Sequence, residues 1–247
     1  MQDILALLTP ADRLEISSGL GFALLLARYA HKAKAKLVID AEEYKYQAGV
    51  HLFAVMLSEH VTAQLATTEP LVYNTHQMYL RDSMPVLDMH IRNQYKLGVK
   101  LVRGAYLDSE DPDVLCESYE KTNEQYNAAI KLCSDRNIHT IVATHNHDSI
   151  KIATSLENPR ISYAQLLGMA DDISHYLAHH GQQVYKYIPY GSVQDVVPYL
   201  VRRAHENKAM TKRAKAERKR YLDEFIRRVK GQVCPTRIDF PVRGNGV

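Results

Sequence analysis

Short apolar runs rich in branched residues recur along this chain, and segments with helical periodicity separate most of them. Runs of this length and composition are typical of buried strands. They cover residues 36–40, 71–74, 99–103, 139–145, 163–167 and 184–188. Helical periodicity is clearest over 20–32, 46–65 and 119–133. Because strands that alternate with helices form βαβ units, this rhythm predicts a parallel sheet covered by helices.

Polar residues stand at the ends of these runs. They are Asp40, Asn74 followed by Gln77, Arg103, His145 and Tyr187. In a (β/α)8 barrel the active site lies at the C-terminal ends of the strands, whereas a doubly wound sheet gathers its site at one switch point. The polar ends are therefore catalytic candidates in a barrel. Six strands are two fewer than a barrel needs, so either two are hidden or part of the fold is missing.

Composition narrows the class of protein further. The 247 residues suffice for one large domain, 46% of them are hydrophobic, and the net charge of +3 gives no argument for nucleic acid. Cys116, Cys133 and Cys234 show no Cys-x-x-Cys spacing, which argues against a disulfide framework or a structural zinc site and fits a reducing compartment. Neither a membrane-spanning apolar run nor a secretory signal is visible.

The segment around residue 200 carries two cations, one ring and one acid on a single helical face. Tyr199, Arg202, Arg203 and Glu206 follow at i, i+3, i+4 and i+7. An exposed stripe of ion pairs explains this spacing without any ligand. Alternatively, the two arginines bind a carboxylate, the ring packs on an apolar ligand and the acid faces an amine, as a small amino acid requires.

The start of that helix is also marked. Ser192 and Asp195 have the spacing of a capping box. Pro198 predicts a kink or a second helix start, because proline lacks the backbone N–H that a helix interior uses.

The pattern Tyr-x-x-Arg-Arg-x-x-Glu at 199–206 resembles the signature helix of the proline dehydrogenase family. Six further blocks resemble that family in the same order. They are Asp-Ala-Glu-Glu at 40–43, Gln77 with Tyr79, Lys-Leu-Val-Arg-Gly-Ala-Tyr at 100–106, Ala-Thr-His-Asn at 143–146, Gln-Leu-Leu-Gly-Met at 165–169 and Tyr-Ile-Pro-Tyr-Gly at 187–191. The resemblance covers residues 35–210, and the residues of several blocks are more similar to the eukaryotic, mitochondrial branch.

This resemblance implies one catalytic domain over 1–247. Its fold would be α/β, a distorted (β/α)8 TIM-like barrel without its first strand and the family's N-terminal helical arm. Members bind FAD at the strand ends, oxidise L-proline to Δ1-pyrroline-5-carboxylate by hydride transfer to the flavin, and pass the electrons to quinone. It also implies a mitochondrial protein on the matrix side of the inner membrane, although no targeting segment is visible.

The resemblance assigns six residues to the substrate. They are Leu166, Tyr187, Tyr199, Arg202, Arg203 and Glu206. The arginines would pair with the carboxylate, the tyrosines would wall the ring, and the leucine would pack on its apolar edge. Tyr187 favours proline over hydroxyproline, because relatives that oxidise hydroxyproline carry a smaller residue there.

Two residues are implied to be catalytic. Asp40 matches a required acid of the family, although capping of the following helix is the common explanation for an aspartate here. Lys100 matches a cation near the reactive edge of the flavin, where it would stabilise developing negative charge. Without the resemblance, Lys100 is more simply a lysine at the start of a strand that reaches solvent.

Seven residues are implied to contact FAD. They are Ala41, Gln77, Arg103, Gly104, Ala105, Thr144 and His145. The 103–105 block offers a cation and then residues small enough for close approach to a phosphate. Gln77 suits the flavin's polar edge, or is a buried amide satisfied by neighbouring strands. His145 and His147 share a strand face, but spacing supplies no third ligand, so no metal is predicted.

The segment 211–230 is predicted to form a basic amphipathic helix. Its apolar stripe is Tyr221, Leu222, Phe225, Ile226 and Val229, set among arginines. Such a helix suits peripheral contact with an anionic membrane, or it docks on the barrel with a solvated basic face. Two other functions stay open: a hydroxyproline dehydrogenase, or a shortened flavin-binding form with little or no activity.

Overall fold

The computed structural model describes residues 9–65, 67–206, 218, 222–223 and 225–230. Six parallel strands form one sheet in the order of the sequence. They are β1 (Leu37–Ile39), β2 (Val72–Gln77), β3 (Gly98–Val102), β4 (Thr140–Ala143), β5 (Ile161–Leu166) and β6 (Val184–Tyr187). All six predicted strands are confirmed, and their ends differ from the predicted ones by a few residues.

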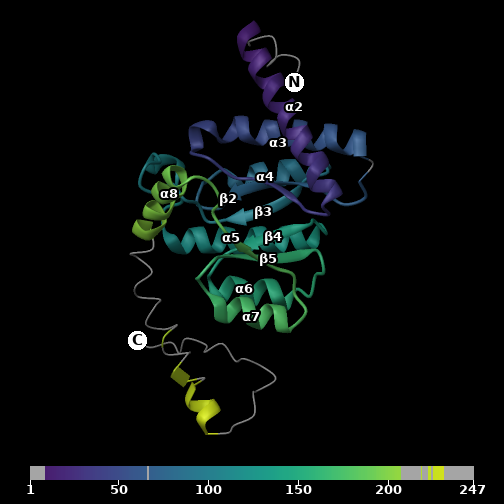
Figure 1. Ribbon diagram of the computed structural model, residues 1–247. Helices are drawn as coiled ribbons and strands as arrows, with labels where there is room; N and C mark the ends of the chain where they lie inside the picture. Colours follow the sequence, from purple (N-terminus) through teal and green to yellow (C-terminus); the bar gives the residue numbers. More distant parts are fainter. Residues whose placement is uncertain (1–8, 66, 207–217, 219–221, 224, 231–247) are drawn as a thin grey trace.

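Helices precede the first strand, connect successive strands and follow the last. They are α2 (Pro10–Lys32), α3 (Tyr44–Leu65), α4 (Ser83–Arg92), the short 3-10 helix η1 (Pro112–Val114), α5 (Tyr119–Asp135), α6 (His147–Ser155), α7 (Asp171–His179) and α8 (Val193–Glu206). In Figure 1, α3 to α7 run alongside the sheet and α2 projects beyond it at the top. No helix in the described part of the chain is both long and apolar enough to cross a bilayer.

One face of the sheet carries the apolar core. Val99, Leu101 and Val142 point from β3 and β4 into a buried cluster that includes Tyr126 and Ile130 of α5. A second cluster joins β2 to α2 and α3 through Val72, Ala27 and Leu57, among others. Because successive strand residues point to opposite faces, the alternate positions line the inner, concave face.

The inner face is filled at the N-terminal ends of the strands. The Lys36 ammonium, just before β1, lies 5.0 Å from the ring centroid of Tyr73 in β2 and 5.9 Å from that of Tyr185 in β6. Burial lowers the pKa of Lys36. Since β2 and β6 are not neighbours in the sheet, this contact requires a strong curl. The sheet is thus half of a barrel, with β1 and β6 as its edges.

The start of α8 agrees with the predicted cap. The backbone N–H of Asp195 donates to Ser192 Oγ over 3.3 Å, and that hydroxyl donates to Asp195 Oδ2 over 2.6 Å. The helix continues through Pro198 rather than starting again there. Most of the predicted helix 211–230 lies outside the described residues, although residues 222–223 and 225–229 are helical.

Gly98 leaves room for the ring of Tyr73 on the inner face, so replacing Gly98 tests how closely the curled sheet packs there. A Cβ atom on Gly98 would lie 2.3 Å from the ring of Tyr73, its partner across the β2–β3 pair. We expect Gly98→Ala to lower the free energy of unfolding by about 1–3 kcal/mol, as overpacking does. Urea denaturation measures this loss. The matched control is Gly49→Ala on α3, where a Cβ meets nothing within 4 Å, and it should stabilise the protein.

Candidate active site

The C-terminal ends of the strands meet at one edge of the sheet, and α8 lies beside that edge (Figure 1). Tyr187 ends β6, and its ring centroid is 5.9 Å from that of Tyr199 on α8. Leu166, the last residue of β5, pairs in register with Tyr187. Three of the predicted substrate residues therefore come together at this edge.

An ion pair joins the first and third strands across the second. The Lys100 ammonium of β3 donates to Oδ1 of Asp40, which follows β1. Lys100 is the sheltered partner, with 16% of its side chain exposed against 57% for Asp40. Lys100 alternates along β3 with Val99 and Leu101, which enter the helix-covered core, so Lys100 lies on the inner face. The structure thus holds a cation inside the curl and a carboxylate at its rim.

The guanidinium of Arg103 is held by three neutral oxygens. Its Nε donates to Asn123 Oδ1 over 2.9 Å, Nη1 to Thr144 Oγ1 over 2.6 Å and Nη2 to Ser149 Oγ over 3.0 Å. Its central carbon also lies 4.4 Å from the ring centroid of Tyr126. These contacts fix the loop after β3 to α5, α6 and the end of β4. Arg103 and Thr144, both predicted cofactor residues, are brought together.

The loop after β1 is tied to the strand ends by buried side chains. Gln77, only 2% exposed, donates its amide N–H to the Glu42 carbonyl over 2.8 Å. The Glu42 N–H donates to Gln47 Oε1 over 3.0 Å. The Tyr106 hydroxyl donates to Glu42 Oε2 over 3.1 Å. These hydrogen bonds fix the backbone of the loop that contains Ala41. The side-chain N–H of Gln77 is used to hold that loop.

Close packing explains why the loop after β3 has a glycine at position 104. Gly104 has φ +138°, and a Cβ there would lie 2.2 Å from the ring of Tyr79. The Tyr79 hydroxyl donates to Glu110 Oε1 over 3.0 Å. Burial, and then Glu110, raises the pKa of Tyr79. A small residue at position 104 is thus required by the protein's own packing, whatever binds beside it.

His145 connects two strand ends. Its Nε2 accepts from the backbone N–H of Leu166 over 3.1 Å, which leaves Nδ1 to carry the proton of the neutral ring. Asn146 caps α6 by accepting from the N–H groups of Asp148 and Ser149. The one group of three possible metal ligands found among the described residues lies elsewhere and does not include His145 or His147.

The side chains of three predicted substrate residues lie outside what the structure describes. The backbone places Arg202, Arg203 and Glu206 in the last turns of α8. They share a helical face with Tyr199 by spacing alone.

Sequence reasoning missed the residues that hold the loops of the site in place. Asn123 and Ser149 bind Arg103, and Glu110 binds Tyr79. Lys186 binds Asp171 Oδ1 over 2.7 Å and so fixes the loop after β5. No sequence signal marked these residues, because each partner lies 15 or more positions away.

A curled parallel sheet with charged and aromatic side chains at its C-terminal edge defines a protein of the α/β-barrel class with its site at the strand ends. The profile of the family described as proline dehydrogenase matches residues 10–216. The chain belongs to the proline dehydrogenase family.

Named relatives agree with this assignment. Proline dehydrogenase 1, mitochondrial, of Dictyostelium discoideum is 34% identical, and the match covers 90% of this chain and 43% of the relative. The human protein of the same name is 31% identical, over 93% of this chain and 42% of its own length. Hydroxyproline dehydrogenase of Rattus norvegicus is 33% identical, and the match covers 85% of this chain and 51% of the relative. The chain thus spans about half or less of the length of these relatives.

Solved structures agree with the fold. A point mutant of proline utilization A (PutA) from Bradyrhizobium japonicum superposes with a TM-score of 0.66 at 23% identity, covering 78% of this chain and 22% of that one. PutA from Bdellovibrio bacteriovorus inactivated by N-propargylglycine gives 0.62 at 22% identity, covering 73% and 21%. The sheet of this chain therefore shares its fold with a part of these larger chains.

The hydrogen bonds of Arg103 give a test of how the site is held. A lysine at position 103 keeps the charge but cannot present three donors in a fixed plane, so some of the three acceptors lose their partner. We expect Arg103→Lys to reduce the free energy of unfolding by about 1–3 kcal/mol. The control is Arg28→Lys, whose exposed guanidinium donates to Gln64 and should matter little. Equal urea midpoints for both variants would contradict the role of Arg103.

Proposed function

We propose that this protein oxidises L-proline to Δ1-pyrroline-5-carboxylate with FAD as hydride acceptor and passes the electrons to quinone. The observation that carries the proposal is the convergence of Lys100, Asp40, Tyr187 and Tyr199 at one strand-end edge in a chain of this family. The whole chain, 1–247, would act as one catalytic domain.

The residues at the edge fit an anionic cofactor. Lys100 and Arg103 supply two cations, Thr144 a hydroxyl, and Ala105 a small side chain beside the loop backbone. Ala41, Gln77, Gly104 and His145 complete the proposed FAD contacts. Lys100 is the one cation on the inner face among these, so it is the residue placed to stabilise negative charge on a bound ring.

The proposed substrate site lies between β6 and α8. Tyr187 is 38% exposed, so its ring face is available at the edge, and Tyr199 packs beside it. Leu166 offers an apolar contact next to Tyr187. Arg202 and Arg203 are proposed to bind the carboxylate, and Glu206 the amine, because they share the helical face of Tyr199.

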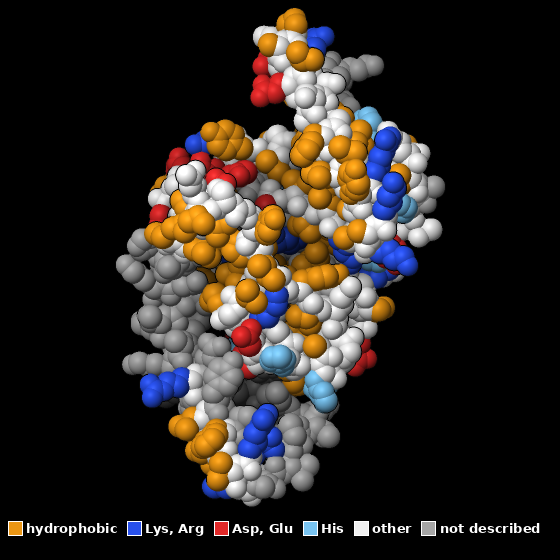
Figure 2. All heavy atoms as spheres, in the orientation of Figure 1, with side chains coloured by type: hydrophobic (Ala, Val, Ile, Leu, Met, Phe, Trp, Pro, Cys, Tyr) orange, Lys and Arg blue, Asp and Glu red, His pale blue; other side chains and the backbone are white. Residues whose placement is uncertain are grey.

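Hydrophobic side chains gather over α8 in Figure 2. Val197, Leu200 and Val201 are each about half exposed. An apolar surface next to a proline site suits exclusion of water from the ring and approach of a hydrophobic quinone.

The proposed chemistry removes a hydride from the ring methylene next to nitrogen, on the side away from the carboxylate, and the proton on nitrogen leaves to solvent, so that the C–N single bond becomes a C=N bond. A bound flavin supplies the hydride acceptor. The protein's own residues hold the ring between the tyrosines, fix the carboxylate, and place the Lys100 charge where negative charge develops. Asp40 keeps that ammonium oriented.

A mitochondrial location is proposed because the relatives of this chain are named mitochondrial proteins. The basic segment 211–230 is proposed to touch the membrane surface that carries quinone. No nucleic-acid partner is proposed.

Anaerobic addition of proline to the FAD-loaded protein tests the proposal. We expect the visible flavin absorbance to bleach, and Lys100→Met to slow bleaching by about 100-fold or more, as loss of one electrostatic stabiliser does. Lys96→Met, at a lysine just before β3, is the control and should bleach normally. Flavin that binds but is never reduced would instead select the inactive flavin-binding form. Failure to bind FAD would reject the proposal altogether.

A second substrate, hydroxyproline, is favoured by the relatives named hydroxyproline dehydrogenase. Tyr187 argues against it, because its ring takes the room that a hydroxyl would need. We expect the wild type to be reduced faster by proline, and Tyr187→Ser to shift the ratio of the two rates toward hydroxyproline by about tenfold. Stopped-flow reduction with each amino acid measures the ratio. A wild type that prefers hydroxyproline would overturn the choice of substrate.

A further inference from the structure

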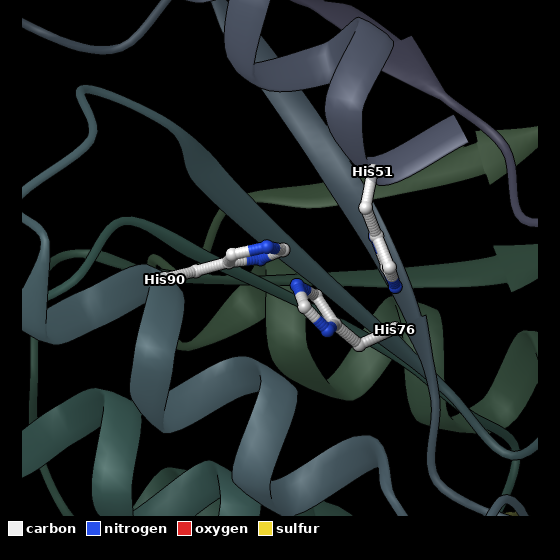
Figure 3. Close-up of side chains that lie close together, drawn as sticks. All are labelled: His51, His76 and His90. Atoms are coloured by element: carbon white, nitrogen blue, oxygen red, sulfur yellow. The ribbon is translucent and has the colours of Figure 1, made fainter. Parts of the chain in front are cut away.

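Three histidines meet on the outer, helix-covered face of the sheet, opposite the inner face that carries Lys100. His51 comes from α3, His76 from β2 and His90 from α4 (Figure 3). One ring nitrogen from each lies within 4.8 Å of the other two. The ring centroids are 4.9 to 5.3 Å apart. We call these three residues the histidine cluster.

The histidine cluster is buried and short of hydrogen bonds. His76 is 1% exposed, and neither of its ring nitrogens has a hydrogen-bond partner. Nδ1 of His90 and Oδ1 of the adjacent Asn74 also have none. A buried polar atom without a partner costs about 1–3 kcal/mol, so four in one place point to a missing ligand.

A metal takes one lone pair from each ring. Among the described residues, both nitrogens of His76 and Nδ1 of His90 are not engaged by any hydrogen-bond donor. Both nitrogens of His51 face side-chain amide nitrogens, so one of those amides must turn for a His51 lone pair to reach the ion. Asp82 lies close enough to favour positive charge on His51 and is the nearby carboxylate that would offset a bound cation. Gln47 Nε2 approaches the His51 ring to 3.2 Å, and Asn74 Nδ2 approaches His51 Nδ1 to 2.8 Å.

A cavity of about 340 Å³ lies beside the cluster. Asn74, His76 and His90 form part of its wall, together with Tyr95 and Arg136. An ion and its water would enter from this cavity, with a small movement of the His76 and His90 side chains. Asn74 Oδ1, which is buried and has no hydrogen-bond partner in the described part of the chain, is the acceptor available to such a water.

We propose that His51, His76 and His90 bind a zinc-class divalent cation with a water as fourth ligand. Three imidazoles and one oxygen form a common tetrahedral ligand set for Zn²⁺, and imidazole suits zinc among the abundant metals. Zn–N bonds of about 2.0–2.1 Å place tetrahedral nitrogens about 3.3 Å apart, so the rings must swing inward by about 1 Å. The ion would link α3, β2 and α4 and so stabilise the fold rather than take part in proline oxidation.

Metal analysis of the untagged, full-length protein tests the site. After incubation with Zn²⁺ and dialysis, we expect about one zinc per chain, independent of FAD content. Co²⁺ in its place should give the intense visible absorption of a tetrahedral site. His76→Leu and His90→Leu should reduce the zinc content at least tenfold. His60→Gln, at an exposed histidine on the same α3 helix, is the matched control and should retain the ion.

Thermal unfolding separates metal loss from misfolding. Without metal, His76→Leu should melt no lower than the wild type, because it replaces a buried imidazole that lacks partners by an apolar group. Zn²⁺ should raise the Tm of the wild type and of His60→Gln but not that of the leucine variants. Wild-type protein that binds no zinc, or leucine variants that bind as much as the wild type, would overturn the proposal.

Discussion

Parallel pairing of six consecutive strands brings all their carboxyl ends to one edge and requires a helical crossover between each pair. The helices cover one face of the sheet and bury its apolar residues there. The other face is left to curl inward, and Lys36 between Tyr73 and Tyr185 shows how far the curl goes. Lys100 reaches the interior because it stands on this inner face, beside Thr75 in the register.

The site also depends on loops that are held by neutral partners. Arg103 donates to an amide and two hydroxyl oxygens, and Gln77 donates to a backbone carbonyl. Hydrogen bonds to these oxygens fix the position and orientation of the guanidinium. Lys100 is held by the carboxylate of Asp40. Asp40 is the more exposed member, so solvent screens its charge more than that of the sheltered ammonium.

The rhythm of apolar runs predicted the six strands because branched residues and run length carry that information locally. It also predicted that residues such as Gln77, Arg103 and Tyr187 come to the shared edge, since strand ends are local features. The same prediction was wrong for Asn74, because β2 continues to Gln77 and leaves Asn74 within the strand, facing His51 of α3. The rhythm did not predict that Gln77 would hold the Glu42 carbonyl, or that the ring of Tyr79 would fill the space beside Gly104. These contacts depend on the curl of the sheet, which no local pattern encodes.

The histidine cluster shows the same limit more sharply. His51, His76 and His90 stand 25 and 14 residues apart, on a helix, a strand and another helix, with none of the short spacing that marks a metal motif. His76 and Gln77 are adjacent on β2, so their side chains point to opposite faces of the sheet. Only the packing of α3 and α4 on the outer face brings the rings together.

The two faces are nevertheless connected through the backbone of Glu42. Its carbonyl accepts from Gln77, the neighbour of His76, and its N–H donates to Gln47, which contacts the His51 ring. The same loop begins with Asp40, the partner of Lys100. An ion that fixed His51 and His76 would therefore restrict both amides that hold the loop.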